Sequence, residues 1–354
     1  MNVLFLDGEI MNKFAFIVHP IEIQDFYGKF PMLKRVPRML AHQIMDVLPP
    51  FKLTTMVGKK ANEVEIEGYL IGVPIGYSNL LEKTGERTGR RIIRACRLAE
   101  KLGAKLIGIG SYLSDIVGMD SDMMGEIKTP ITTGKHLGIL ALIEAAKTAA
   151  EWKGRKFKES DIIVLGIEHP LGGVLSRKIA REAKYLTLIS RERNSLEVLS
   201  KTILEESGTA VHVSHKVQSS IERGEVIFIL DWKDGGVDWT KLRKNAILCD
   251  LSRFRKASLE IKSLREDILC LDDGFIKLPW TIETQAEYNV EISKNTCSSA
   301  LAETILLSLE SHLDSISLRD GPTMDSIHQM HQWAENYSYQ LAGIRHLKEE
   351  IPIL

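Results

Sequence analysis

The sequence predicts an α/β protein whose central region forms a doubly wound parallel sheet. Six short apolar runs lie between residues 161 and 273, and helical or polar segments separate them. The first run, residues 162–165, leads directly into Gly166, and Gly172 then opens an amphipathic segment. Short apolar strands that alternate with helices are typical of a parallel sheet covered on both faces. Because crossovers in such sheets are right-handed, a doubly wound topology is expected.

The strands of this central region are expected at six places along the chain. They are residues 162–166, 185–190, 210–213, 226–230, 245–251 and 267–273. Helices are predicted between the first three strands, at residues 172–183 and 195–207. The apolar runs have the length of strands, and the segments between them show the spacing of amphipathic helices.

The region before residue 153 also mixes strands and helices. Residues 13–20 and 64–76 predict strands, and residues 105–114 predict a strand followed by a loop. Residues 88–104 predict an amphipathic helix that ends at Gly103, with arginines on its polar face. That face, which includes Arg90, Arg91 and Arg94, is expected to lie in solvent, where its charge could also steer an acidic carrier protein.

Two further helical regions are predicted. Residues 132–152 form a helix in which Thr132 or Thr133 is the expected N-cap. After residue 292 the chain is expected to be helical, over residues 296–311 and 323–350. The prediction is therefore an N-terminal α/β domain, the doubly wound domain, and C-terminal helices that pack back on the core.

Composition limits the class of protein. A length of 354 residues suggests more than one domain, and the polar stretch at 153–160 favours domains at 1–152, 153–290 and 291–354. The net charge of −1 argues against a nucleic-acid-binding protein. We expect no membrane span, no secretory signal and no metal site. Four separated cysteines without a CxxC pair predict free thiols and a cytoplasmic protein.

The turn after the first central strand resembles the glycine loop of a dinucleotide-binding Rossmann-type sheet. Gly166 and Gly172 occupy its first and third glycine positions, and Gly173 follows at the start of the helix. His169 stands where the second glycine normally lets a pyrophosphate approach, and Pro170 follows it. His169 either obstructs the pyrophosphate or donates a hydrogen bond to it. A sheet of this shape that binds no nucleotide remains an alternative.

The end of the second central strand bears on the choice of cofactor. An acidic residue there would bind the ribose 2′-hydroxyl of NAD, but this chain has Ser190, Arg191 and, two residues later, Arg193. The arginines favour the 2′-phosphate of NADP. Two solvated arginines in a loop are the alternative.

Five segments occur here in an order that resembles one family. They are FAFIVHP, GAKLIGIGSYLSDIVG, TPITTGKHLGI, the strand–loop–helix at Gly166, and ALAETILLSLE, spread over residues 13–310. They look like segments of the cyanobacterial long-chain acyl-[acyl-carrier-protein] reductases, and of bacterial proteins grouped with them as predicted amino-acid or shikimate-type dehydrogenases.

This resemblance implies an NADPH-dependent reductase. A cysteine would take the acyl group from a thioester, and hydride transfer would then release an aldehyde. The N-terminal domain would hold the acyl substrate with the threonine–threonine–glycine segment and its neighbour, the central domain would hold the nucleotide, and an acyl carrier protein would be a partner. The substrate residues implied are Thr132, Thr133, Gly134 and Lys135.

The chain departs from the family pattern at several positions. Ala300 stands where the nucleophilic cysteine is expected, Lys135 replaces an asparagine, and Asp231–Lys233 stand where small residues normally lie beside the nicotinamide. Cys297 lies three residues before Ala300. On a helix it would be one turn away, capped by Ser293, Asn295 or Thr296, and could serve as the nucleophile. An inert buried thiol is the alternative.

Two further residues are candidates for catalysis. His136, at the start of a helix, could polarise a carbonyl or orient a substrate, or could simply be a polar residue of the first turn. Glu303 lies in an apolar helix, where an acid needs a partner, and could position a cysteine or a cationic group. The leading prediction is an NADP-dependent oxidoreductase of the acyl-thioester type. The alternatives are a catalytically silent relative and an amino- or hydroxy-acid dehydrogenase.

Overall fold

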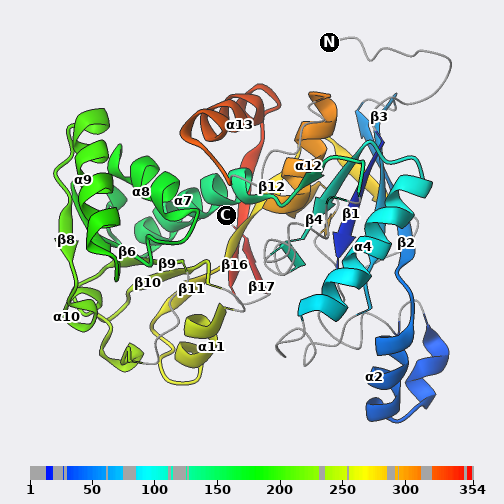
Figure 1. Cartoon of the computed structure of the whole chain (residues 1–354), viewed down its shortest axis with the longest axis horizontal. Helices are drawn as coiled ribbons and strands as arrows, with labels where there is room; N and C mark the ends of the chain where they lie inside the picture. The colour runs from blue at the N-terminus through cyan, green and yellow to red at the C-terminus, as the bar shows by residue number, and fades with distance from the viewer. Residues whose placement is uncertain are drawn as a thin grey trace. The chain divides into compact units, whose positions relative to one another are not determined.

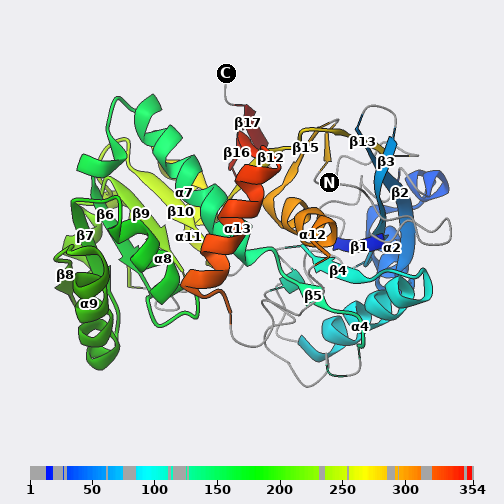
Figure 2. The same cartoon turned by 90° about the horizontal axis from the view of Figure 1, so that it is seen from above.

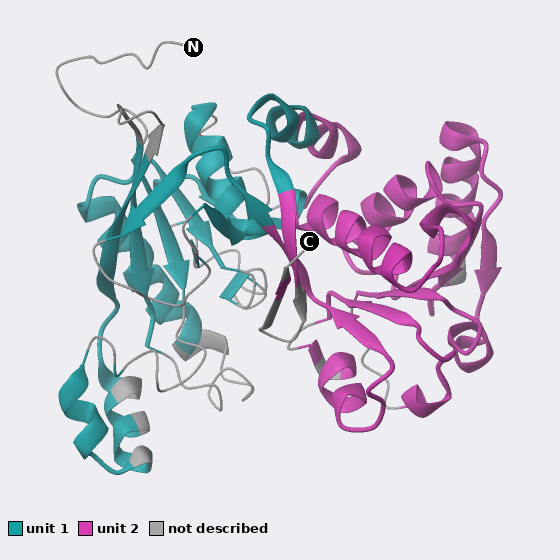
Figure 3. Cartoon of the chain, turned by 180° about the vertical axis from the view of Figure 1, so that it is seen from behind, with its two compact units in different colours: residues 1–137, 276–320, 330–340 teal, residues 138–275, 321–329, 341–354 magenta. Residues whose placement is uncertain are grey.

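The chain forms two compact units (Figure 1 and Figure 3). The computed structural model describes residues 13–18, 27, 30–60, 63–74, 85–110, 113–114, 125, 127–230, 236–252, 255–284, 292–293, 295–311, 321–346 and 349–352. Unit 1 comprises residues 1–137, 276–320 and 330–340, and unit 2 comprises residues 138–275, 321–329 and 341–354. The three-domain division made from the sequence stays a prediction.

Unit 1 is built on a mixed six-stranded sheet with the order β13-β2-β3-β1-β4-β5. Strands β1, β3, β4 and β5 run parallel, whereas β2 is antiparallel to β3 and to β13. The strands are β1 (Lys13–Val18), β2 (Phe51–Lys60), β3 (Glu63–Gly72), β4 (Leu106–Ile109), β5 (Ile131–Thr132) and β13 (Thr281–Thr284). A short hairpin, β14 (Ile292–Ser293) and β15 (Thr296–Ser298), belongs to the same unit.

Helices α4 (Gly85–Lys101) and α12 (Ser299–Leu309) pack on this sheet, and Figure 2 shows α12 beside β1 and β4. The approach of α12 is close because Gly108 in β4 has no side chain. A Cβ there would lie 2.0 Å from the Thr304 hydroxyl oxygen. On α4 the predicted apolar face is buried, and Gly103 after it has the positive φ of a helix stop. One polar residue differs from the prediction, because Arg91 is 9% exposed and donates to the Leu48 carbonyl at 2.6 Å.

Unit 2 confirms the predicted doubly wound parallel sheet. Its six strands have the order β11-β10-β9-β6-β7-β8, and all five neighbouring pairs are parallel. Counted from β6 as the first strand, this is the order 3-2-1-4-5-6 of dinucleotide-binding sheets. The strands are β6 (Asp161–Leu165), β7 (Tyr185–Ile189), β8 (His212–Ser214), β9 (Val226–Ile229), β10 (Ile247–Asp250) and β11 (Leu269–Leu271).

Helices cover both faces of the unit 2 sheet. In Figure 1, α8 (Gly172–Ala180) and α9 (Arg193–Ser207) lie above it, and α10 (Val217–Ile221) and α11 (Lys256–Lys262) lie below it. The strands are buried accordingly: apart from exposed Asp161 at the start of β6, the side chains of β6, β9 and β10 are almost wholly shielded from solvent. The single-turn helices η2 (Phe157–Glu159) and η3 (Trp239–Lys241) complete the connections.

Several elements differ from the sequence predictions. The helix predicted over 323–350 ends early: α13 spans Met324–Asn336, and an antiparallel hairpin of β16 (Gln340–His346) and β17 (Glu349–Pro352) follows. Ser338, between α13 and β16, has a φ of +56°, a value that is incompatible with a continuing α-helix. Strands β2 and β12 (Asp273–Lys277) were not predicted from the sequence. The helix α7 (Lys135–Trp152) was predicted. Two helices, η1 (Pro31–Arg35) and α2 (Arg38–Val47), add a small helical lobe to unit 1.

Candidate functional site

The turn after β6 lies at the carboxyl edge of the unit 2 sheet, next to the point where the strand order reverses between β6 and β9. Ligands of open α/β sheets bind at this position. Gly166 begins the turn with a φ of +85°, and its N–H donates to the Ile189 carbonyl of β7 at 3.0 Å. Only glycine adopts this backbone conformation without strain, so the first glycine is required by the turn itself.

Gly172 allows helix α8 to start directly against the backbone of the turn that follows β6. A Cβ at Gly172 would lie 2.2 Å from the Ile167 carbonyl oxygen, a backbone atom that cannot swing away. This is the packing role of the third glycine in dinucleotide-binding turns. At Gly173 a Cβ would meet nothing within 4 Å, so that glycine is not required by packing.

His169 engages much of the turn that a phosphate would otherwise contact. Its ring Nδ1 accepts the Leu171 N–H at 3.2 Å, and its carbonyl accepts the Gly172 N–H at 2.7 Å. Its own N–H donates to the Gly166 carbonyl at 3.1 Å, and Pro170 has no N–H. Because Nδ1 accepts, the neutral imidazole carries its proton on Nε2. The helix start therefore presents fewer N–H groups than an all-glycine turn.

The residues after β7 are arranged as a turn into α9. Ser190 is buried, and its hydroxyl accepts the Glu192 N–H at 3.0 Å. Its carbonyl lies 3.2 Å from Nδ1 of His215, which follows β8. Arg191 is exposed, and Arg193 is the first residue of α9. Ser190 and Arg191 thus stand where the ribose end of a dinucleotide is held in this fold.

One buried acid at the same edge was not singled out from the sequence. Asp250, the last residue of β10, is wholly buried and accepts from the Ser252 and Ser258 N–H groups at 3.0 and 2.9 Å. It also accepts the Ser252 hydroxyl at 2.5 Å. Its signal in the sequence is an acid at the end of an apolar run. Asp231–Lys233, singled out from the sequence, lie outside the described residues.

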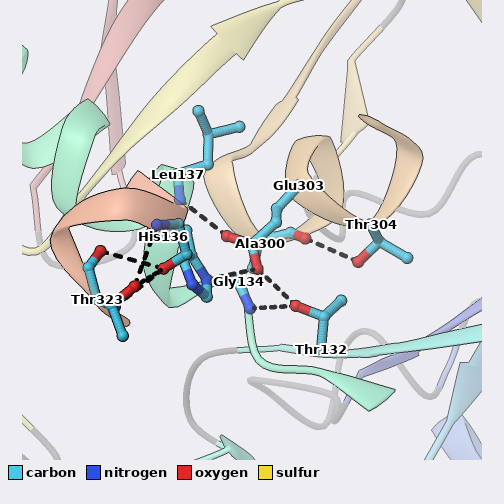
Figure 4. Close-up of polar contacts among 9 residues, drawn as sticks. Thr132, Gly134, His136, Leu137, Ala300, Glu303, Thr304 and Thr323 are labelled. Carbon is cyan, nitrogen blue, oxygen red and sulfur yellow. Dashed lines mark hydrogen bonds and ion pairs between the residues drawn. The ribbon is translucent and has the colours of Figure 1, made fainter. Parts of the chain in front are cut away.

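In unit 1, Glu303 brings together most of the residues predicted around the threonine–threonine–glycine segment (Figure 4). Its carboxylate is completely buried in α12. One oxygen accepts the Thr132 hydroxyl at 2.5 Å, and the other accepts the Leu137 N–H at 2.8 Å. Nδ1 of His136, also completely buried, lies 3.6 Å from the first oxygen.

This arrangement caps α7 from a distant part of the chain. The helix begins at Lys135, so neither Thr132 nor Thr133 occupies the predicted N-cap position. That position belongs to Gly134, which has no side chain, and the orphan N–H of Leu137 is satisfied by Glu303 instead. Thr133, which follows Thr132 in the sequence, is also buried. Lys135 is half-buried at the first helical position.

The Glu303 carboxylate is held in its ionised form. Burial opposes ionisation, but the proximity of His136 and the hydrogen bonds from Thr132 and Leu137 outweigh it, so the pKa of Glu303 lies below its usual value of 4.5. The 3.6 Å between Nδ1 of His136 and the Glu303 carboxylate is too long for a strong hydrogen bond.

Gly134 and Ala300 touch at the centre of this cluster. Gly134 has a φ of +73°, and a Cβ on it would lie 2.4 Å from the Ala300 Cβ. The segment and α12 therefore approach because both residues are small. Ala300, at the position of the expected nucleophile, is buried in this contact and carries no reactive group.

Cys297 has a different setting from the predicted one. It lies in strand β15, paired with Ile292, and not on a helix one turn from Ala300. The N-cap of α12 is Ser298, whose hydroxyl accepts the Leu301 N–H at 3.4 Å. The Cys297 side chain is completely buried. Its assignment as a nucleophile stays a prediction.

The other cysteines are buried, with thiols that resist ionisation. Burial, with a smaller contribution from Glu100, raises the pKa of Cys96 far above 9. Burial likewise raises the pKa of Cys249 well above 9 and that of Cys270 to about 12. Thiolates are the reactive form, so these three are poor nucleophiles.

Neither a metal centre nor a membrane helix is found in the part of the chain that the structure describes. No three or more His, Cys, Asp or Glu side chains gather there in a metal-binding group. None of the described helices is long and apolar enough to cross a bilayer.

Comparison with the sequences of known proteins finds a distant similarity to an aminotransferase. No family model matches the chain. It is 23% identical over 355 residues to the aminotransferase PigE of Serratia sp. (strain ATCC 39006). The similarity covers 96% of this chain and 41% of that protein, so the chain spans less than half the length of its relative. The likeness to long-chain acyl-[acyl-carrier-protein] reductases is not shown by these comparisons.

Solved structures resemble the chain only weakly. L-tryptophan dehydrogenase from Nostoc punctiforme has a TM-score of 0.34 at 11% identity, covering 92% of this chain and 79% of that one. 5-ketofructose reductase of Gluconobacter sp. strain CHM43 has 0.33 at 11%, covering 92% and 97%. Shikimate 5-dehydrogenase from Listeria monocytogenes has 0.31 at 8%, covering 73% and 86%. Scores this low assign neither a fold nor an activity to the chain.

Proposed function

We propose that this protein is an NADP(H)-dependent oxidoreductase whose nucleotide binds at the carboxyl ends of β6 and β7 in unit 2. The observation that carries the proposal is the all-parallel order β11-β10-β9-β6-β7-β8 with Gly166 and Gly172 in the first strand-to-helix turn. Sheets with this order bind dinucleotides at the strand edge where the order reverses.

The described residues fit two parts of the cofactor, the pyrophosphate and the 2′-phosphate. The turn has the positive φ at Gly166 and the close helix start at Gly172 that bring a pyrophosphate to a helix N-terminus. Exposed Arg191, directly after Ser190, suits a 2′-phosphate and supports NADP over NAD. When bound, the nicotinamide accepts or supplies a hydride. His169 is the residue that fits least, because it occupies two N–H groups of the turn.

The chain's cysteines support a reaction without a covalent acyl intermediate. Reduction of an acyl thioester through a cysteine needs a thiolate that the substrate can reach. Cys297 is completely buried in β15, and Ala300 occupies the expected nucleophile position. We therefore favour direct hydride exchange with a small amino- or hydroxy-acid type of substrate. The acyl-thioester reaction, with an acyl carrier protein as partner, is the variant that requires Cys297 to become accessible.

A catalytically silent protein is the second candidate, and the His169 contacts favour it. The Leu171 and Gly172 N–H groups are already bonded to His169, so the turn offers a pyrophosphate less than usual. A protein of this kind would bind dinucleotides weakly and act through contacts with other proteins. We do not extend the aminotransferase activity of PigE to this chain, which matches 41% of that protein.

Nucleotide binding separates the candidates. Titration of the full chain with NADPH and with NADH, followed by calorimetry, should give measurable NADPH binding and weaker NADH binding. Absence of binding for both would contradict the oxidoreductase proposal and support the silent protein.

A mass measurement then separates the two reaction types. After incubation with a long-chain acyl thioester, we expect no added acyl mass on Cys297, because its side chain is buried. An acyl adduct there that Cys297→Ala abolishes would overturn our preference and establish the covalent route.

A further inference from the structure

A small helical lobe of unit 1 exposes an unusual number of apolar side chains. This α2 lobe, residues 30–51, consists of η1, α2 and the residues that flank them. Within it, Met32, Met39, Leu40 and Val47 are 75, 77, 47 and 75% exposed. The exposed large apolar residues of unit 2 are instead spread over several elements, among them α7, β7 and α9: Trp152, Tyr185, Val198, Leu204, Leu259 and Leu264. Scattered residues of that kind are normal, whereas a cluster indicates an interaction surface.

The lobe is a built structure with its own core. Leu33 and Ala41 are buried in it, and partly buried apolar residues pack around them: Tyr27, Phe30, Val36, Ile44, Leu48 and Phe51. The rings of Phe30 and Phe51 meet edge to face, with centroids 5.3 Å apart. Arg91 of α4 fastens the end of the lobe through its hydrogen bond to the Leu48 carbonyl. The exposed apolar side chains are therefore not part of the core that stabilises the lobe.

The exposed apolar side chains of α2 share one side of the helix. Successive residues are about 100° apart around a helix axis, so Met39, Leu40 and Val47 fall within a sector of about 100°. Ala41, Ile44 and Leu48 fall in a separate sector of about 60°, which faces the lobe's own core. Helix α2 thus has one apolar side facing its core and, next to it, an outward sector in which three exposed apolar side chains flank Gln43.

The same lobe also carries exposed basic residues. Lys34 and Arg35 are both exposed on η1. Residues 31–50 contain three basic residues and one acidic residue, although the whole chain has a net charge of −1. In Figure 1 and Figure 3 the lobe projects beyond the ends of the neighbouring strands of unit 1. A projecting helix with an apolar side and adjacent basic residues has the composition of a helix that lies in a membrane interface.

We propose that the α2 lobe docks the protein on an anionic lipid surface. Met39, Leu40 and Val47 enter the headgroup region, and Lys34 and Arg35 contact lipid phosphates. A second copy of the chain fits less well, because a two-fold contact through this lobe would bring the basic residues of each copy together. This proposal does not depend on the nucleotide site, which lies in unit 2.

Vesicle sedimentation with the full chain tests the proposal. Vesicles of phosphatidylcholine alone are compared with vesicles that also contain phosphatidylglycerol. We expect binding to the anionic vesicles only, weakened by salt. The variants are Met39→Gln with Leu40→Gln, and Lys34→Glu with Arg35→Glu. Because one basic residue near an anionic surface contributes about fivefold in affinity, each pair should lower binding by at least about tenfold.

A matched control uses equally exposed apolar residues elsewhere. Val198→Gln with Leu204→Gln alters α9, where the side chains are 68 and 52% exposed, and should leave vesicle binding unchanged. All variants change exposed side chains, so their thermal unfolding midpoints should match that of the parent chain. The proposal is overturned if the parent chain binds neither vesicle or binds both equally. It is also overturned if light scattering shows a dimer that the Met39 and Leu40 changes dissociate, with no vesicle binding.

Discussion

Replacing Glu303 tests how far the buried carboxylate holds unit 1 together. Glu303→Ala removes the acceptor of two hydrogen bonds and leaves the Thr132 hydroxyl and the Leu137 N–H buried without it. Hydrogen bonds to a charged group contribute about 1.5–3 kcal/mol each, so the free energy of unfolding should fall by about 3–6 kcal/mol. Glu303→Gln keeps one acceptor oxygen and an amide of similar shape, and should cost about 1–2 kcal/mol.

The same variants should differ in their response to pH. The pKa of Glu303 is lowered in the folded state, so its contribution is present above the unfolded value of 4.5. It is lost as the pH falls through the lowered folded pKa. The parent chain should therefore lose stability relative to Glu303→Gln as the pH is taken below 4.5, and the difference between them should be constant above about pH 6.

Urea unfolding at pH 7, followed by far-UV circular dichroism, measures the loss. A chain of two units need not unfold in one step, so hydrogen exchange of the peptide containing Leu137 gives a local measurement. That amide should exchange much faster in Glu303→Ala than in Glu303→Gln. A cost of less than about 1 kcal/mol for Glu303→Ala, or unchanged exchange at residue 137, would be incompatible with a buried carboxylate that caps α7.

Three further predictions concern unit 2. His169→Gly removes the ring acceptor of the Leu171 N–H and should tighten NADPH binding by about five- to tenfold, measured by calorimetry; weaker binding would mean that His169 is a phosphate ligand. Arg191→Ser should weaken NADPH binding by about ten- to hundredfold, since a charge-assisted contact contributes about 1.5–3 kcal/mol. The same change should leave NADH binding unchanged. Equal losses of affinity for both cofactors would refute the 2′-phosphate assignment. Gly172→Ala should destabilise unit 2 by more than about 2 kcal/mol in urea unfolding, because its Cβ would meet a backbone oxygen. Gly173→Ala is the matched control and should be neutral or stabilising, because a Cβ there meets nothing within 4 Å. Equal effects at the two positions would contradict the packing role of Gly172.

The sequence alone determined the fold of unit 2 because its signals are local. Each strand is a short apolar run, and the turn glycine Gly166 follows its strand directly. The two predicted helices, α8 and α9, are amphipathic segments, whereas α10 and α11 were not predicted. The right-handed crossover rule then leaves few topologies for such a chain. Cys249 and Cys270 lie in two of these apolar runs and are buried.

Other elements had no such local signal. The segment after Asn336 has the charged and apolar residues of a helix, but it turns at Ser338 and pairs as the hairpin β16–β17. Strand propensity depends on the neighbouring strand, which the sequence of one segment does not contain. Cys297 entered β15 by pairing with Ile292, again a contact and not a propensity.

The candidate site in unit 1 shows the same division most clearly. Glu303 was chosen from the sequence because an acid in an apolar helix requires a partner. His136 was chosen because it stands at a helix start, and Thr132 because the family resemblance implies it. The sequence placed the cap of α7 on a neighbouring threonine, whereas the folded chain satisfies the Leu137 N–H with a carboxylate 166 residues away. An orphan N–H at a helix start donates to any acceptor that packing brings within about 3 Å. The residue types that need partners could therefore be recognised from the sequence, but which partners they take was decided only when α12 packed against the Gly134 turn.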